Sequence, residues 1–171
     1  MRQLTHREVA FGFRKNPIHL VCPDWQDPRN VGSAFRLADA AGLSGLILSG
    51  KSPCPPHSKI AKTARSTERT VPWSSTDDLL AELKEAKGKG AYLMALEITD
   101  ESQSLLEFDL PPISSDHPLY LIAGNEASGV AQELLDICDV SVHLPMYGQN
   151  TSMNVAVALG AAVYLLLGNT A

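Results

Sequence analysis

The chain has 171 residues, 44% of them hydrophobic and 19% charged, and a formal net charge of -5. This length suits one domain with a buried core, and the composition is typical of a soluble globular protein. The negative net charge argues against a nucleic-acid binder that is basic over its whole surface.

Short apolar runs alternate with helical patterns along the chain. The runs expected to be strands are 18–22, 45–48, 91–96, 119–123 and 140–144. They lack strict alternation of apolar and polar residues, which is typical of strands buried on both faces of a parallel sheet. Helices are predicted at 31–41, 77–86, 129–138 and 152–167. This pattern predicts a single α/β domain over residues 1–171, with a mostly parallel sheet flanked by helices.

The first helix candidate carries the pattern Asn30-x-Gly32-x-x-x-Arg36. Asn30 is suited to an N-cap because its side-chain oxygen can accept a free backbone N–H. Gly32 would allow a backbone or a ligand to approach closely. Arg36 could be a solvated surface residue, or its planar guanidinium could bind a phosphate through two parallel hydrogen bonds.

The fourth strand candidate runs into Gly124-Asn125-Glu126, and Gly129 follows closely. Ligands of α/β proteins bind beyond the carboxyl ends of the strands, so a glycine turn with an acid at this place favours a binding site. The alternative is that Glu126 only interacts favourably with the N-terminus of a helix.

The last third of the chain contains Leu144 and Met146, then a polar loop, and then Ser152-x-Asn154 where the last helix should begin. Free backbone N–H groups at a helix start can bind a ligand, and Ser152 is also suited to cap the helix. The apolar run 155–167 is shorter than the roughly 20 residues that span a bilayer, so it predicts a buried helix.

The three patterns, in this order and at these distances, resemble the SpoU/TrmH family of the SPOUT superfamily over residues from about 18 to 167. Members of this family are RNA methyltransferases that use S-adenosylmethionine, have a C-terminal trefoil knot and form homodimers. The resemblance implies the same knot, cofactor and dimer here, and a minimal chain without a separate N-terminal RNA-binding domain. One departure is Ala127-Ser128, because the family usually has glycine directly after the acid.

The resemblance also implies roles for individual residues. Those expected at the catalytic site are Asn30, Arg36, Glu126, Ser152 and Asn154. Those expected to line the S-adenosylmethionine pocket are Leu96, Gly124, Leu144, Met146, Ser152 and Met153. Because arginine has a pKa above about 12, Arg36 is expected to orient RNA and stabilise charge, with a substrate phosphate as the possible proton acceptor.

Four basic residues are expected to contact RNA, namely Lys59, Lys62, Arg65 and Arg69. Their intervals of three or four would gather them on one helix face. A solvated charged face is the plain alternative. The second choice for the RNA contact is the N-terminal set Arg2, Arg7, Arg14 and Lys15, and the mostly acidic stretch 77–109 should point away from RNA.

The remaining features limit the setting in which the protein works. Cys22, Cys54 and Cys138 are far apart and form no Cys-x-x-Cys pair, so neither a disulfide framework nor a zinc site is expected. The first residues lack the apolar stretch of a signal peptide. We therefore expect a cytoplasmic protein with no metal and no membrane segment.

The resemblance implies an S-adenosylmethionine-dependent RNA 2′-O-ribose methyltransferase that acts on tRNA, or otherwise on rRNA. One alternative is a non-catalytic RNA-binding accessory protein with the same fold, which would not need the whole set of site residues. Another is a nucleotide-binding oxidoreductase, which is disfavoured because no strand candidate is followed by Gly-x-Gly-x-x-Gly.

Overall fold

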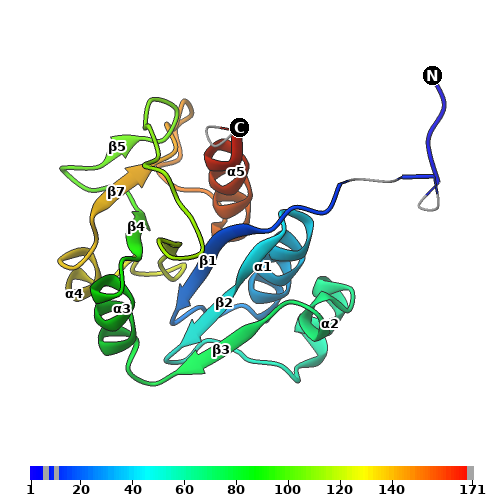
Figure 1. Ribbon diagram of the computed structural model, residues 1–171, viewed down its shortest axis with the longest axis horizontal. Helices are drawn as coiled ribbons and strands as arrows, with labels where there is room; N and C mark the ends of the chain where they lie inside the picture. Colours follow the sequence, from blue (N-terminus) through cyan, green and yellow to red (C-terminus); the bar gives the residue numbers. More distant parts are fainter. Residues whose placement is uncertain (6–7, 10–11, 169–171) are drawn as a thin grey trace.

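The computed structural model describes residues 1–5, 8–9 and 12–168 (Figure 1). In this part of the chain seven strands form one sheet, in the order β3-β2-β1-β6-β4-β7-β5, and their pairings are parallel. The strands are β1 (Asn16–Pro23), β2 (Leu43–Ser49), β3 (Trp73–Thr76), β4 (Tyr92–Leu96), β5 (Gln103–Ser104), β6 (Leu119–Ala123) and β7 (Val140–His143). The helices are α1 (Pro28–Ala40), α2 (Ser58–Ala64), the 3₁₀-helix η1 (Thr67–Arg69), α3 (Leu79–Gly88), α4 (Gln132–Leu135) and α5 (Val155–Gly168).

Helices cover both faces of the sheet, which confirms the predicted α/β class with a mostly parallel sheet. On one face, α1, α2 and α5 pack against strand residues such as Leu20 and Leu121. On the other face, α3 and α4 pack against residues such as Val21 and Ile122. Neighbouring positions on one strand are therefore both buried, which explains the continuous apolar runs of β1 and β6.

The strand order gathers the functional loops. Strand β6 lies between β1 and β4, and β7 pairs with the other edge of β4. Because the strands are parallel, the carboxyl ends of β1, β6, β4 and β7 lie at the same edge of the sheet. The pocket residue Leu96 is the last residue of β4, and the predicted motifs follow the ends of β1, β6 and β7.

Helix α1 begins earlier than predicted, so Asn30 is not its N-cap. The cap is Asp27, whose carboxylate accepts a hydrogen bond from Arg29 N at 2.8 Å, and Pro28 follows at the first helical position. Asn30 therefore lies inside the first turn, where its residue is only 8% exposed. The helix ends as predicted before Gly42, which has a φ of 60°.

Two other predicted helices need correction. The helix predicted at 129–138 is reduced to α4, since Gly129 has a φ of 67° and Ala131 is extended. Ser152 does not cap the last helix. Asn154 does, because its Oδ1 accepts hydrogen bonds from Ala156 N at 3.0 Å and Val157 N at 3.3 Å.

Gly32 serves the packing of two helices and not a ligand. A Cβ atom at this position would lie 2.7 Å from the Ile60 carbonyl oxygen and 2.8 Å from the Thr63 Cβ. Helices α1 and α2 can approach this closely only because position 32 carries no side chain.

Candidate active site

A cavity of about 570 Å³ opens at the carboxyl edge of the sheet. Its lining includes every residue that was predicted to contact a cofactor, namely Leu96, Gly124, Leu144, Met146, Ser152 and Met153. Glu126 and Asn154 also line it, whereas Asn30 and Arg36 do not. The apolar wall comes from the ends of β4 and β7, and the polar wall comes from the loops after β6 and β7.

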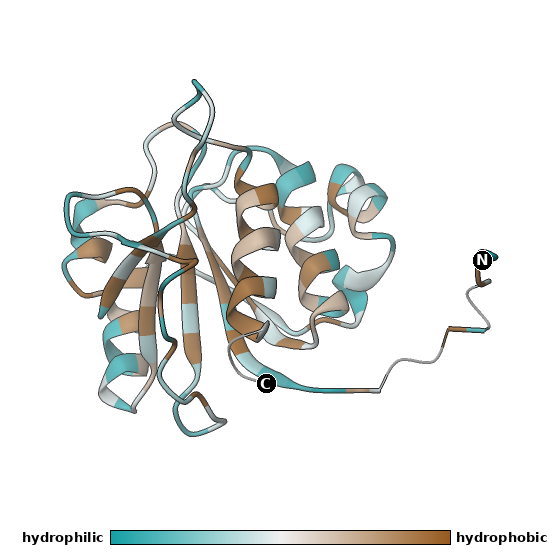
Figure 2. Cartoon of the chain, turned by 90° about the horizontal axis from the view of Figure 1, so that it is seen from above, coloured by the Kyte–Doolittle hydropathy of each residue, from teal (hydrophilic) through white to brown (hydrophobic). Residues whose placement is uncertain are grey.

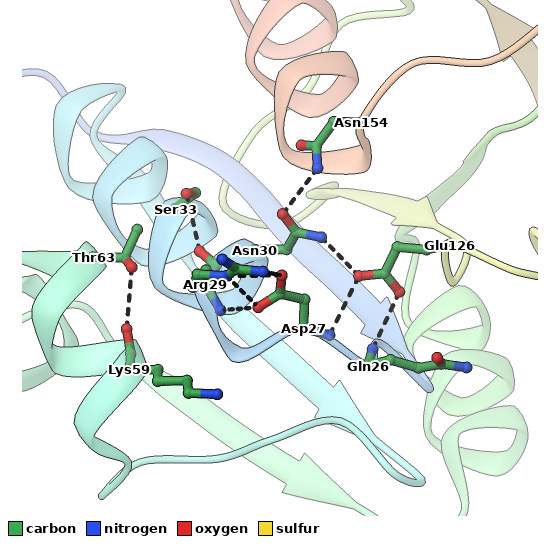
Figure 3. Close-up of polar contacts among 9 residues, drawn as sticks. All are labelled: Gln26, Asp27, Arg29, Asn30, Ser33, Lys59, Thr63, Glu126 and Asn154. Atoms are coloured by element: carbon green, nitrogen blue, oxygen red, sulfur yellow. Dashed lines mark hydrogen bonds and ion pairs between the residues drawn. The ribbon is translucent and has the colours of Figure 1, made fainter.

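Three residues from the three motifs form one hydrogen-bonded chain beside this cavity (Figure 3). Asn154 donates from Nδ2 to Asn30 Oδ1 at 3.1 Å, and Asn30 donates from its own Nδ2 to Glu126 Oε1 at 2.7 Å. The amide of Asn30 thus accepts from one motif and donates to another. These two hydrogen bonds fix the starts of α1 and α5 relative to the loop after β6.

Glu126 also holds the backbone that leads into α1. Its Oε2 accepts a hydrogen bond from Gln26 N at 3.1 Å, and its Oε1 accepts one from Asp27 N at 3.4 Å. Partial burial alone would raise the pKa of Glu126, but the hydrogen bonds from Asn30 and from the backbone N–H groups outweigh it and lower the pKa. Glu126 is therefore an ionised carboxylate at neutral pH, with both oxygens engaged.

The loop that presents Glu126 closes on itself. Asn125 and Gly129 exchange two backbone hydrogen bonds of 3.1 Å, and Asn125 Oδ1 accepts from the N–H groups of Ala127 and Ser128 at 2.8 Å. A Cβ atom on Gly124 would lie 2.0 Å from the Gly129 carbonyl carbon. Gly124 is thus required by its own loop. It also lines the cavity, as predicted.

Glu97 belongs to the site although the sequence patterns did not single it out. It follows β4 directly, lines the cavity, and accepts a hydrogen bond from Val130 N at 2.9 Å through Oε2. Its other oxygen accepts from Ile98 N at 2.9 Å. The available signal is an acidic residue directly after a buried strand.

Arg36 lies on the exposed face of α1, two helical turns beyond Arg29. Its side chain makes no hydrogen bond or ion pair within the described residues 1–5, 8–9 and 12–168. A rise of 1.5 Å per residue places it about 9 Å along the helix from Asn30. The structure therefore keeps Arg36 near the site but outside the hydrogen-bonded chain.

The four basic residues predicted to share a helix face do not do so. Helix α2 holds only Lys59 and Lys62, because Arg65 adopts a left-handed conformation with a φ of 58° and ends the helix. Arg69 lies on η1, where it forms an ion pair of 3.6 Å with Glu68. The regular spacing in the sequence thus crosses a sharp turn of the chain.

Across the described ranges, His, Cys, Asp and Glu side chains form no group of three that could hold a metal ion. In the same ranges, every helix is too short or too polar to cross a membrane.

The family model for the SpoU rRNA Methylase family matches residues 17–164, which is most of the chain. The chain belongs to this family. Among curated relatives, the 23S rRNA (guanosine-2′-O-)-methyltransferase RlmB of Ralstonia nicotianae is 30% identical over 92% of this chain and 61% of its own length. The chain spans about six tenths of the length of the first curated relatives that it matches.

Solved structures share the fold. The SpoU methyltransferase AviRb of Streptomyces viridochromogenes, in complex with AdoMet, matches with a TM-score of 0.75 and 25% identity over 91% of this chain and 61% of that one. A structure solved for the 2-OH methylation of C/U34 on tRNA matches with a TM-score of 0.76 and 28% identity, over 90% of this chain and 97% of that one. The predicted SpoU/TrmH membership is confirmed.

Proposed function

We propose that this protein is an S-adenosylmethionine-dependent RNA 2′-O-ribose methyltransferase that acts on tRNA, with rRNA as the second choice. The observation that carries the proposal is the chain Asn154–Asn30–Glu126 beside a cavity at the carboxyl ends of the strands. The relatives support the reaction, since RlmB of Ralstonia nicotianae is a 23S rRNA (guanosine-2′-O-)-methyltransferase. The tRNA preference is supported by the structure for 2-OH methylation of C/U34 on tRNA.

The cavity fits the cofactor in size and in chemistry. Sites for small molecules usually measure about 300 to 1,000 Å³ and combine apolar walls with a few polar groups. Leu96, Leu144 and Met146 supply the apolar wall, and the loop around Ser152 supplies polar groups. When bound, S-adenosylmethionine would supply a methyl group on a positively charged sulfur.

The protein's own residues have separate roles in the proposed reaction. Glu126 is a weak base because its pKa is lowered and both of its oxygens accept hydrogen bonds, so it organises the loops and does not take the ribose proton. Ser152 and Asn154 both line the cavity, and we propose that they contact the cofactor and the ribose. Arg36 orients the RNA and stabilises charge, and a substrate phosphate accepts the proton.

The proposal includes a C-terminal trefoil knot and a homodimer, as in the family. The dimer is supported by α5, which has no charged residue and is coloured mostly brown in Figure 2. Two of its large side chains are exposed, Val157 by 61% and Tyr164 by 56%. A second copy of the chain would cover this apolar stripe. We also propose a cytoplasmic location, in keeping with three free cysteines.

Calorimetry with S-adenosylhomocysteine and NAD tests the cofactor directly. The expected result is binding of S-adenosylhomocysteine and none of NAD. A Met146→Asp variant, which places a charge on the apolar wall, should lose most of the affinity while the fold is kept. Binding of NAD alone would favour an oxidoreductase. Binding of RNA without S-adenosylhomocysteine would favour the non-catalytic accessory protein.

A further inference from the structure

We propose that Arg29, held in place by Asp27, binds a phosphate of the RNA strand whose ribose is methylated, and that Lys59 assists it. This inference rests on the proposed function, which supplies the RNA. It adds a residue that lies outside the predicted basic run.

The guanidinium of Arg29 is anchored along one edge only. Its Nε donates to both carboxylate oxygens of Asp27, at 3.0 and 2.9 Å, and its Nη2 donates to Asp27 Oδ2 at 2.7 Å. A guanidinium has five N–H donors in a planar fork. The donors of Nη1 and the second donor of Nη2 therefore remain for another partner, and 71% of the side chain is exposed.

Asp27 is itself held firmly, so it can orient Arg29. Its Oδ1 caps α1 by accepting from Arg29 N at 2.8 Å, and its own N–H donates to Glu126 Oε1 at 3.4 Å. Only 31% of its side chain is exposed. The ion pair with Arg29 is thus built into the start of the helix, unlike a pair between two freely moving surface side chains.

The location suits an RNA phosphate at the reacting nucleotide. Arg29 precedes Asn30, whose amide contacts Glu126 and Asn154 on the cavity wall. Figure 3 shows Arg29 and Asp27 directly beside this hydrogen-bonded chain. A phosphate bound here would lie next to the mouth of the cavity, whereas Arg36 is two turns farther along α1.

Acidic side chains near Arg29 make a positive charge necessary if a phosphate is to bind there. Glu126 and Glu97 both line the cavity, so an approaching phosphate meets two carboxylates. Lys59, at the start of α2, is close enough for its charge to favour the ionised form of Asp27 and lower its pKa, after the larger effect of the Arg29 hydrogen bonds. Figure 3 shows Lys59 on α2, the helix next to α1, which carries Arg29. Arg29 neutralises Asp27, and Lys59 adds one further positive charge, so both reduce the negative charge that a phosphate would meet here.

The test measures binding of bulk tRNA and bulk rRNA over a range of salt concentrations. Arg29→Ala should lower RNA affinity about tenfold at low salt, since a charge-assisted hydrogen bond is lost. It should also reduce the slope of the log–log salt plot by about 0.7 to 0.9, the effect of one lost phosphate contact. Arg29→Lys should restore the slope but only part of the affinity, because the fork is missing.

Asp27→Asn tests the anchoring role, since asparagine keeps the N-cap and removes the ion pair. RNA affinity should fall, because Arg29 is no longer oriented. If Asp27 only repelled phosphate, affinity would rise instead, and its positioning role would be refuted.

Lys89→Ala is the matched control. This lysine is 73% exposed and ion-paired with Glu85, but it follows α3 on the opposite face of the sheet, so its variant should keep the wild-type slope. A wild-type slope in Arg29→Ala, with methyl transfer to RNA intact, would refute the inference and leave the proposed function standing. Absence of methyl transfer by the wild type would refute both.

Discussion

Asn30 donates a hydrogen bond to Glu126 across 2.7 Å, although 96 positions separate the two residues in the chain. The contact joins the first turn of α1 to the loop after β6. An amide suits this place because it donates to the carboxylate and at the same time accepts from Asn154 at 3.1 Å. Aspartate has nearly the same shape but cannot donate when it is ionised.

Asn30→Asp should therefore destabilise the protein. The new carboxylate, in a buried position, would face the more exposed carboxylate of Glu126, and the bonds to both partners would change. We expect the free energy of unfolding to fall by about 1 to 3 kcal/mol, measured by urea denaturation at pH 7. Asn150→Asp makes the same charge change on an exposed loop and should have little effect. Equal stability of the two variants would contradict the structural role of Asn30.

Gly124→Ala should disrupt the loop that carries Glu126. The new Cβ would meet the backbone of Gly129 and Val130 at 2.0 to 2.2 Å, so the loop would have to move. We expect a loss of about 2 kcal/mol or more in unfolding free energy and weaker S-adenosylhomocysteine binding. Gly88→Ala is the control, because nothing lies within 4 Å of its Cβ position. A Gly124→Ala protein as stable as this control would show that the close approach is wrong.

The lowered pKa of Glu126 predicts how stability depends on pH. A carboxylate whose pKa is below its usual value of 4.5 in the folded state stabilises the protein above that pH. This contribution is lost as the pH falls below about 4.5 and through the folded-state pKa. Urea midpoints of Glu126→Gln should therefore lie below those of the wild type at pH 7 and approach them near pH 3. Parallel curves over this range would argue against an ionised, hydrogen-bonded Glu126.

Arg36→Ala should leave S-adenosylhomocysteine affinity unchanged, because Arg36 does not line the cavity. Turnover on RNA should fall by about 10²-fold or more if the guanidinium stabilises charge in the transition state. Arg36→Lys should recover little of the rate, because lysine lacks the planar fork. Near-normal turnover in Arg36→Ala would make Arg36 an ordinary solvated residue.

Val157→Asp should dissociate the proposed homodimer. Val157 is 61% exposed on α5, so an aspartate would be tolerated by the monomer but would place a charge in an apolar interface. Sedimentation should then give half the wild-type mass. Leu106→Asp, at a residue that is 53% exposed elsewhere on the surface, should keep the wild-type mass. An unchanged mass for Val157→Asp would mean that any dimer uses another face.

The sequence was informative where burial decides the structure. The apolar runs of β1, β4 and β6 predicted a parallel sheet because both faces of these strands are covered. Strand β3 was missed because most of its residues are exposed and polar, and it forms only by pairing with β2. For the same reason β5, with two residues at the sheet edge, gave no pattern of its own.

Several residues that line the cavity could be singled out from the sequence, but their arrangement could not. Nothing in the order of the motifs indicates that Asn30 lies between Asn154 and Glu126, since these contacts depend on how distant loops meet. The packing role of Gly124 has no signal in the sequence either, because the backbone that it accommodates belongs to its own loop. Local sequence patterns identify residues that can bind a ligand, and only the fold determines which residues contact one another.

Methyl transfer to the ribose 2′-hydroxyl of RNA is tested most directly by mass spectrometry of the nucleosides formed. The purified protein is incubated with isotopically labelled S-adenosylmethionine and with bulk tRNA or rRNA, and the RNA is then digested to nucleosides. We expect label in 2′-O-methylnucleosides, and none when Asn154→Ala replaces the wild type. Label found only on the bases, or no transfer to any RNA by a protein that binds S-adenosylhomocysteine, would contradict it.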